Sequence, residues 1–200
     1  MTQTPRLVLA SGSPRRRDVL AQLGLHPDVR PSSVDETYPH GESPAAHVER
    51  LARAKAAAEG ALQPDALVLA GDTIVVLDGR VLGKPKDAHD AVATLMSLAG
   101  RTHEVMSALA LAGKHGMVSQ VSRASVRFRD FDAATARAYA ETGEPLDKAG
   151  AYGIQGLGAA LIDSIAGDYY CVVGLPVGAL LDLLARAGWR YEFGRLIPAS

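Results

Sequence analysis

The sequence predicts one α/β domain over residues 1–200, built on a mixed, elongated and twisted sheet flanked by helices. Two observations carry this prediction: short apolar runs alternate with helical runs, and hairpin signals interrupt the alternation at Asp78-Gly79 and around residues 113–116. Alternation favours parallel strands joined by helices, whereas hairpins add antiparallel pairs. The long middle strands indicate an extended sheet with a cleft.

In the first half of the chain, apolar and helical runs are short and clearly bounded. Residues 6–10 form a β-type run, and Pro14 lies where a helix favours proline, at its first position. Gly60 follows a helical run that begins at Pro44 and is expected to end it. These patterns predict strands over 6–10, 28–33, 66–70, 73–77 and 80–82, and helices over 14–23, 44–60 and 88–98.

In the second half, two longer β-type runs come first and a glycine-rich stretch follows. Residues 144–158 contain five glycines or prolines, which predicts a long loop. The remaining patterns predict strands over 105–111, 117–128, 159–165 and 190–193, and helices over 132–141 and 175–187.

Composition and charge narrow the class of protein. Hydrophobic residues make up 48% and charged residues 22% of the chain, and the net charge of -1 argues against a broadly basic nucleic-acid binder. Cys171 is the single cysteine, so no internal disulfide or CxxC metal site can form, and its apolar neighbours predict a buried thiol. There is no run of about 18 apolar residues and no signal-peptide pattern. We therefore expect no membrane partner and a cytoplasmic location.

A cluster near the N-terminus points to an anion. After the first predicted strand, the chain reads Ser11-Gly12-Ser13-Pro14-Arg15-Arg16. Ser13 is of a type that caps helices, and the free amides and dipole of a helix start attract an anion. The guanidinium groups of Arg15 and Arg16 suit phosphate oxygens. A capped helix with exposed arginines is the plainer alternative, but the whole cluster favours a phosphate site.

Lys55 and Glu36 can each be interpreted in two ways. Lys55 stands at the end of the stripe formed by Val48, Leu51 and Ala52 at helical spacing. A lysine there either extends to water or pairs with a negative group in a cleft. Glu36 lies beside another carboxylate in a polar stretch and would usually be solvated, although carboxylates near polyphosphate are what Mg²⁺ requires.

Asp72 follows an apolar run and precedes Thr73, which predicts a corner of small residues at the end of a buried strand. An acid at such a place can ligate a metal or act as a general base. A turn aspartate is the alternative. The hairpin that follows returns the chain to Lys84, which we expect on the same side as Asp72.

The glycine-rich stretch over 150–158 does not match GxGxxG at a strand-to-helix junction, so the sequence does not predict a dinucleotide fold. Its glycines would allow a ligand or another backbone segment to approach closely. Gln155 lies among them, and its amide can pair with the edge of a base through one donor and one acceptor.

Taken in order, these segments resemble the Maf family of nucleoside triphosphate pyrophosphatases. The resemblance spans nearly the whole chain: LASGSPRR, the Asp-Glu pair near residue 36, LARAKA, AGDTIV with LGKP, GEPLDKAGAYGIQG and VVGLP. It implies an α/β fold of two lobes with a deep cleft, and metal-dependent cleavage between the α and β phosphates. It further implies a homodimer. Gln155, Thr73 and Arg15 are similar to the branch that acts on dTTP and UTP.

The resemblance also implies a role for each site residue. The catalytic residues would be Asp72, Glu36, Lys55 and Lys84. Glu36 and Asp72 would hold Mg²⁺ or Mn²⁺, and Asp72 would be either a metal ligand or the base for the attacking water. Substrate binding and specificity would fall to Ser11, Ser13, Arg15, Arg16, Thr73 and Gln155.

Two other functions fit parts of this pattern. One is a pyrophosphatase for modified nucleotides such as 7-methyl-GTP. The other is a nucleotide-binding regulator of cell division with weak catalysis, which could keep the basic residues but would not need Glu36 and Asp72 together. The joint presence of these two carboxylates favours an enzyme.

Overall fold

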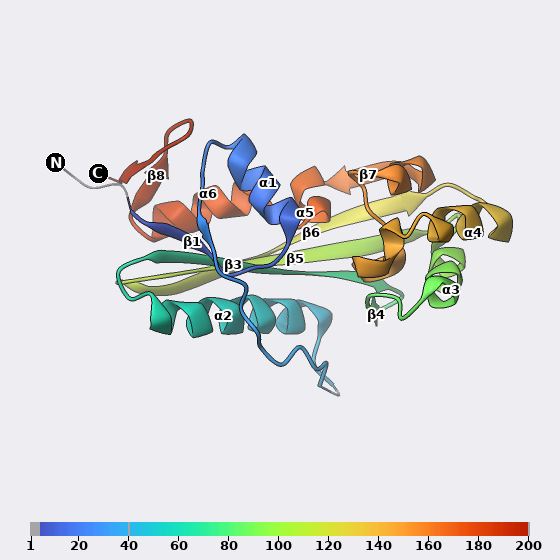
Figure 1. Cartoon of the computed structure of the whole chain (residues 1–200), viewed down its shortest axis with the longest axis horizontal. Coiled ribbons are helices and arrows are strands. Elements are labelled where there is room, and N and C mark those ends of the chain that lie inside the picture. The colour runs from blue at the N-terminus through green and yellow to red at the C-terminus, as the bar shows by residue number, and fades with distance from the viewer. Residues whose placement is uncertain (1–4, 40, 200) are drawn as a thin grey trace. The chain divides into compact units, whose positions relative to one another are not determined.

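The computed structural model describes residues 5–39 and 41–199, shown in Figure 1. The strands are β1 (Leu7–Leu9), β2 (Asp28–Val29), β3 (Leu67–Leu77), β4 (Arg80–Leu82), β5 (Thr102–Gly113), β6 (Gly116–Phe128), β7 (Ile162–Gly167), β8 (Trp189–Tyr191) and β9 (Leu196–Pro198). The α-helices are α1 (Pro14–Gln22), α2 (Pro44–Leu62), α3 (Ala88–Leu98), α4 (Ala133–Glu141), α5 (Tyr169–Val173) and α6 (Val177–Arg186). Three short 3-10 helices are η1 (Glu144–Asp147), η2 (Ala149–Ala151) and η3 (Leu157–Leu161).

Among these residues, seven strands form one sheet in the order β2-β1-β3-β5-β6-β7, with β4 paired to β3 outside this row. Strand β1 is parallel to both β2 and β3, whereas β4 and β7 run antiparallel to β3 and β6. The sheet is therefore mixed, and the predicted fold class is confirmed.

Contacts divide the chain into two compact units. The first unit comprises Met1–Asp72, Ser107–Ser122 and Gly174–Ser200, and the second comprises Thr73–Met106 and Arg123–Val173. Strands β3, β5 and β6 contribute residues to both units. The single domain over 1–200 and the deep cleft between two lobes stay predictions.

The first unit is built around β1 and the start of β3. Val8, Leu9, Val68 and Leu69 are all fully buried. Continuous apolar runs of this kind are expected in parallel strands that are covered on both faces. In Figure 1, α2 lies along one face of this part of the sheet, and α1 and α6 lie along the other.

In the second unit, α3 packs against α4 beside the ends of β3, β5 and β6. His103, Phe128 and Tyr152 form an edge-to-face cluster in this core, with ring centroids 4.8–5.3 Å apart. The predicted burial of Cys171 is confirmed: the side chain is fully buried, and its thiol donates to the carbonyl oxygen of Val105 at 3.6 Å.

Two predicted element boundaries are wrong. Gly60 does not end α2, which continues to Leu62, because glycine is tolerated inside a helix at a cost of about 1 kcal/mol; a Cβ at Gly60 would meet Ala112 at an ordinary 3.5 Å. The corner predicted at residues 70–73 is also wrong, because β3 runs unbroken through Asp72.

The loops differ from expectation as well. The strand predicted over 28–33 keeps only Asp28–Val29, the two residues paired with β1. The loop predicted over 144–158 contains η1 and η2 and the start of η3, and β7 begins only after η3 ends. Of the helices in the described ranges, none is both long and apolar enough to cross a membrane.

Candidate active site

The start of α1 forms as predicted, but its cap differs. Ser13 occupies the N-cap position with an extended backbone, and Pro14 is the first helical residue. The Ser13 side chain makes no capping bond, and the Ser13 amide instead donates to the hydroxyl oxygen of Ser11 at 3.2 Å. Ser11 is buried, so its hydroxyl fixes the turn that connects β1 to α1.

Arg16 is buried. The alternative prediction for this cluster, a capped helix with exposed arginines, is therefore wrong for Arg16. Its Nε donates to the carbonyl oxygen of Gly174 and its Nη1 donates to the hydroxyl of Ser11, both at 2.9 Å. The pKa of Arg16 is lowered, mainly because the side chain is buried, although the nearby charges of Asp72 and Glu36 act in the opposite direction. The protein therefore holds a positive charge inside the first unit, in the field of two carboxylates.

Gly71 explains why β3 can pass so close to this arginine. A Cβ at Gly71 would lie 2.9 Å from Leu109 Cδ2 and 3.1 Å from both the Ala108 carbonyl oxygen and Arg16 Nε. These separations are shorter than ordinary carbon contacts, so any side chain would push the strand away from β5 or displace the guanidinium. The glycine before Asp72 thus serves close packing within a strand, not a corner.

Lys55 lies at the centre of the site. The stripe of Val48, Leu51, Ala52 and Lys55 is buried as predicted. The Lys55 ammonium lies 2.6 Å from Glu36 Oε1 and 2.8 Å from Asp72 Oδ1. Of its two predicted alternatives, pairing with negative groups is the one observed.

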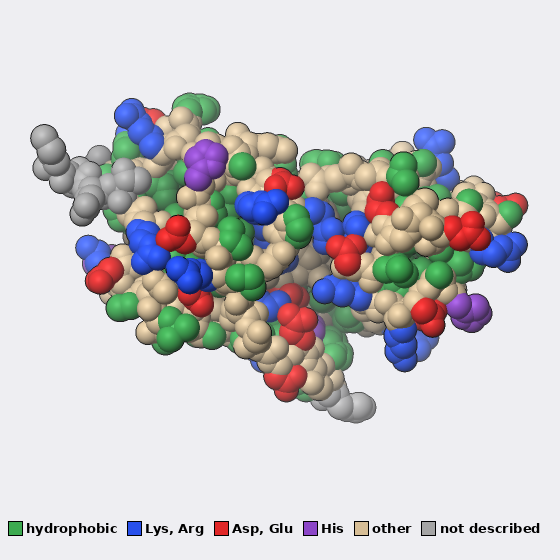
Figure 2. Space-filling model, viewed as in Figure 1, with side chains coloured by type: hydrophobic (Ala, Val, Ile, Leu, Met, Phe, Trp, Pro, Cys, Tyr) green, Lys and Arg blue, Asp and Glu red, His purple; other side chains and the backbone are tan. Residues whose placement is uncertain are grey.

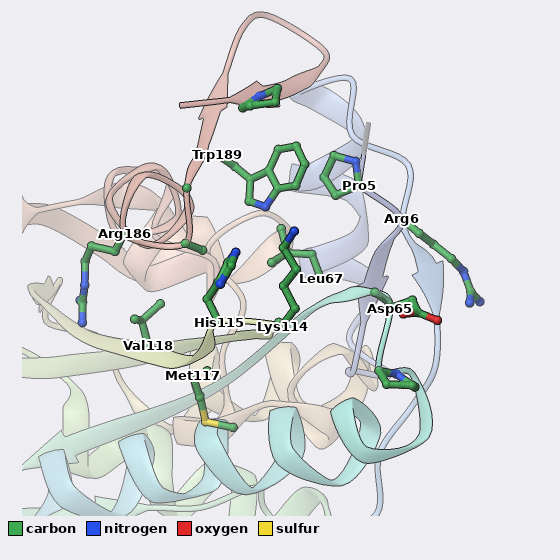
Figure 3. A pocket seen from close by; sticks show the side chains of 17 residues that line it. Pro5, Arg6, Asp65, Leu67, Lys114, His115, Met117, Val118, Arg186 and Trp189 are labelled. Carbon is green, nitrogen blue, oxygen red and sulfur yellow. The ribbon is translucent and has the colours of Figure 1, made fainter. Parts of the chain in front are cut away.

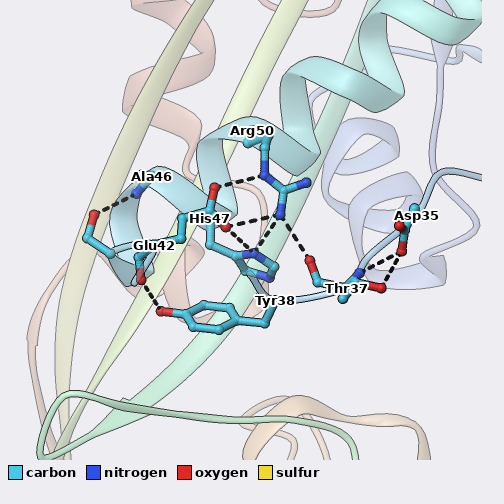
Figure 4. A network of polar contacts seen from close by, with 8 residues as sticks. Asp35, Thr37, Tyr38, Glu42, Ala46, His47 and Arg50 are labelled. Atoms are coloured by element: carbon cyan, nitrogen blue, oxygen red, sulfur yellow. Dashed lines mark hydrogen bonds and ion pairs between the residues drawn. The ribbon is translucent and has the colours of Figure 1, made fainter. Parts of the chain in front are cut away.

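A network of polar contacts, drawn in Figure 4, holds the segment that carries Glu36. Arg50 of α2 donates to the carbonyl oxygen of Thr37 at 3.1 Å and to Glu42 Oε1 at 2.8 Å. His47 lies 2.9 Å from Glu42 Oε2. The hydrogen bond from Arg50 is the main cause that lowers the pKa of Glu42 to about 2. This carboxylate is therefore ionised at neutral pH and ties the segment to α2.

This network was not predicted from the sequence, although the sequence contains a signal for it. Ser43 caps α2 through a bond from the Ala46 amide to its hydroxyl, which places Glu42 just before the first turn. His47 and Arg50 then follow at three-residue spacing on one side of the helix, where side chains are neighbours.

The structure brings five of the predicted site residues together within the first unit: Ser11, Arg16, Glu36, Lys55 and Asp72. Arg15 lies half-buried on α1. Thr73, Lys84 and Gln155 belong to the second unit, where Thr73 continues β3, Lys84 is exposed after β4, and Gln155 is exposed in a turn. The predicted roles of all ten residues stay predictions.

The donor set fits a divalent cation that completes its coordination with substrate. Glu36 and Asp72 supply carboxylate oxygens that reach the same ammonium, so the two groups lie close together. Within residues 5–39 and 41–199, no group of three or more His, Cys, Asp or Glu side chains could hold a metal ion. Mg²⁺ is commonly bound by one or two carboxylates together with phosphate oxygens and water, which matches a pair of this kind.

The first unit also contains a cavity of about 770 Å³ away from these residues. Lys114 and His115, at the tip of the β5–β6 hairpin, point toward Trp189 across it (Figure 3). None of the predicted site residues lines this cavity. On the face seen in Figure 2, positive and negative side chains are interspersed, in keeping with the net charge of -1.

The fold is mixed α/β, and its first unit brings together a buried arginine and a lysine held between two carboxylates, groups that can bind phosphate oxygens and a divalent cation. The chain belongs to the Maf-like protein family, whose profile matches residues 6–187.

Curated relatives cover most of the chain. A dTTP/UTP pyrophosphatase of Desulfotalea psychrophila is 52% identical over 89% of this chain and 92% of its own length. Proteins with the same name from Moorella thermoacetica and Myxococcus xanthus are 51% and 50% identical, each over 92% of this chain and 95% of their own length. A solved nucleoside-triphosphatase / dITP/XTP pyrophosphatase from Mycobacterium abscessus overlaps with 62% of this chain and 74% of its own, at 19% identity and a TM-score of 0.39.

Proposed function

We propose that this chain hydrolyses dTTP and UTP to the nucleoside monophosphate and pyrophosphate. The observation that carries the proposal is the joint contact of Lys55 with Glu36 and Asp72, beside the buried Arg16. Relatives about 50% identical over most of the chain bear the name of this activity, which supports the choice of substrate.

The triphosphate would bind where the first unit concentrates donors and positive charge. The amides at the start of α1 and the guanidinium groups of Arg15 and Arg16 suit phosphate oxygens. Ser11 and Ser13 shape this turn. Lys55 would exchange a carboxylate partner for a phosphate oxygen, and Lys84 would add a second ammonium from the chain that follows β4.

Glu36 and Asp72 would hold Mg²⁺ or Mn²⁺. When bound, such an ion neutralises charge on the phosphate oxygens and favours departure of pyrophosphate. The backbone that carries each carboxylate is held in position. Asp72 lies within β3, and the segment that carries Glu36 is hydrogen-bonded to α2 through Arg50.

Asp72 pairs with Lys55 through its Oδ1, which accepts from the Lys55 ammonium at 2.8 Å. Oδ2 could take the proton of the attacking water while water oxygen bonds to phosphorus, the α–β bridging bond breaks and pyrophosphate leaves with the electron pair. The alternative is that Oδ2 ligates the cation, with bulk water as the proton acceptor.

Base preference would come from Gln155, Thr73 and Arg15. Gln155 is exposed in its turn, so its amide can donate and accept along the edge of a pyrimidine. A site built to bond a polar edge rejects ligands that leave its groups unpaired.

The first test is pyrophosphate release from dTTP, UTP, CTP, ATP, GTP and 7-methyl-GTP with Mg²⁺ or Mn²⁺, and with EDTA as a control. We expect release mainly from dTTP and UTP, abolished by EDTA. Release chiefly from 7-methyl-GTP would keep the reaction and overturn the substrate. Binding of nucleotides without release would favour the regulator instead.

The second test is Asp72→Asn, which removes charge but keeps shape. Turnover should fall by about 10²-fold or more, while nucleotide binding measured by calorimetry changes little. The matched control is Asp65→Asn, an exposed aspartate shortly before β3, which should leave turnover unchanged. Near-normal turnover in Asp72→Asn would contradict its assigned role.

We also propose, from the family resemblance, that the protein forms a homodimer and works in the cytoplasm. Light scattering of the purified chain would reveal a mass of two chains in the first case, and fractionation of the source cells would test the second.

A further inference from the structure

The glycine turn, residues 153–158, wraps around one carboxylate. Glu144 Oε2 accepts from the amide of Leu157 at 2.8 Å, and Oε1 accepts from the amide of Gly158 at 3.1 Å. Burial raises the pKa of Glu144, but the bonds from these two amides, from Tyr139 and the charge of Lys148 outweigh it and leave the pKa lowered. Glu144 is therefore a charged anchor at the C-terminal end of the glycine turn.

Tyr139 extends the same anchor to the other end of the turn. Its hydroxyl donates to Glu144 Oε1 at 2.8 Å and accepts from the amide of Gly153 at 3.1 Å. The tyrosine ring is itself fixed in the hydrophobic core of the second unit. One hydrogen-bonded pair thus holds the backbone on both sides of Gln155, at Gly153 and at residues 157–158.

The three glycines of the turn let its backbone lie directly against these side chains. A Cβ at Gly153 would lie 2.7 Å from Lys148 Cε, and one at Gly156 would lie 2.5 Å from Glu144 Oε2. A Cβ at Gly158 would meet the Tyr139 hydroxyl at 2.5 Å and the Gly153 carbonyl oxygen at 2.7 Å. The spacing of the glycines is therefore explained by close approach of the turn to Glu144, Tyr139 and Lys148.

We propose that Glu144, with Tyr139, is a positioning residue that sets the preference for pyrimidine nucleotides by holding the Gln155 turn in one conformation. This rests on the proposed function, in which the exposed Gln155 amide reads the base. A turn that is already ordered loses less conformational entropy when a base binds, and it fixes the direction of the amide. A mobile turn would weaken recognition of the pyrimidine edge without touching the phosphate site.

The decisive experiment is a double-mutant cycle between Glu144→Gln and Gln155→Ala, with kcat and KM measured for dTTP, UTP, ATP and GTP. An amide has the shape of the carboxylate but accepts through one atom only, so it cannot receive all three donors. In Glu144→Gln we expect kcat/KM for dTTP and UTP to fall about tenfold, mainly through KM, with the low activity on purine nucleotides unchanged. In the Gln155→Ala background, Glu144→Gln should change the pyrimidine-to-purine ratio no further.

Glu141→Gln is the matched control. It is an exposed glutamate at the end of α4, three residues from Glu144, and should leave the ratio unchanged. Should Glu144→Gln fail to fold, Tyr139→Phe removes the bonds to Glu144 and Gly153 alone and undergoes the same test. The thermal midpoint of each variant separates a loss of stability, which affects all nucleotides alike, from a loss of base preference.

Three results for Glu144→Gln would overturn the proposal: an equal loss for all four nucleotides, an unchanged ratio in the folded variant, or a fall in the ratio that is just as large without the Gln155 amide. If Gln155→Ala alone leaves the ratio unchanged, the role of Gln155 is wrong and the proposal falls with it. A wild-type chain with no pyrimidine preference would overturn the proposed function itself.

Discussion

His103 should make the stability of the second unit depend on pH. The side chain is 4% exposed, and its Nε2 lies 2.8 Å from the Tyr152 hydroxyl, while Nδ1 has no partner among the described residues. Burial lowers the pKa of His103 to about 4. The unfolded chain, with an ordinary histidine pKa of about 6.5, binds the proton more readily, so acid favours unfolding.

The size of this effect follows from the two pKa values. Stability is unaffected by His103 well above pH 6.5 and falls as the pH drops through 6.5 toward 4. The full loss is about 3 kcal/mol, of which about 2 kcal/mol is reached by pH 5. Below about pH 4 both states are protonated, and the contribution of His103 no longer changes.

The assay is urea unfolding of the wild-type chain and of His103→Gln at pH 7.5, 6 and 5. Glutamine does not titrate and can still bond to the Tyr152 hydroxyl, so the variant should lose about 2 kcal/mol less than the wild type between pH 7.5 and 5. His89→Gln, at an exposed position of α3, should follow the wild type. Equal pH dependence in wild type and His103→Gln would refute the reasoning.

Two further predictions concern the first unit. Gly71→Ala should lower the free energy of unfolding by about 1–3 kcal/mol, because its Cβ would overlap Leu109 and the Ala108 carbonyl oxygen. The control is Gly178→Ala in α6, where a Cβ would meet nothing within 4 Å; this substitution should leave the free energy of unfolding unchanged or raise it by up to about 1 kcal/mol. Equal free energies of unfolding for the two variants, measured in urea, would contradict close packing at Gly71. Arg50→Met should raise the Mg²⁺ concentration that gives half-maximal pyrophosphate release several-fold, because the segment of Glu36 loses its bond to α2. Arg53→Met, which removes a bond to Ser119, serves as its control, and an equal shift in both variants would contradict a special role of Arg50.

The sequence predicted those parts of the fold and site that depend on local pattern. The stripe that ends at Lys55 follows helical spacing, and the turn into α1 follows from proline at the first helical position. Neither pattern shows which group a side chain contacts. Lys55 pairs with a carboxylate and Arg16 is buried because of residues far away in the sequence, such as Asp72 for Lys55 and Gly174 for Arg16.

The glycines show the same limit more clearly. Gly71 and Gly60 suggested a corner and a helix end, because a glycine's local preference is for breaks. In the structure both lie inside regular elements, and Gly71 is there because β5 and Arg16 come close. The glycine turn is predicted to admit a ligand or another backbone segment, and the atoms that approach its glycines belong to Glu144, Tyr139, Lys148 and the backbone of Gly153. A sequence shows where a glycine stands, but not which neighbouring atoms leave no space for a side chain there.

The burial of Cys171 makes the protein well suited to site-specific labelling. Because the single native thiol is fully buried in α5, a cysteine introduced at an exposed position would react alone with maleimide reagents. Ala21 on α1 and Glu141 on α4 are exposed positions in the first and second units. A pair of spin labels or fluorophores at these two sites would report the separation of the units, with and without nucleotide, in an otherwise unaltered background.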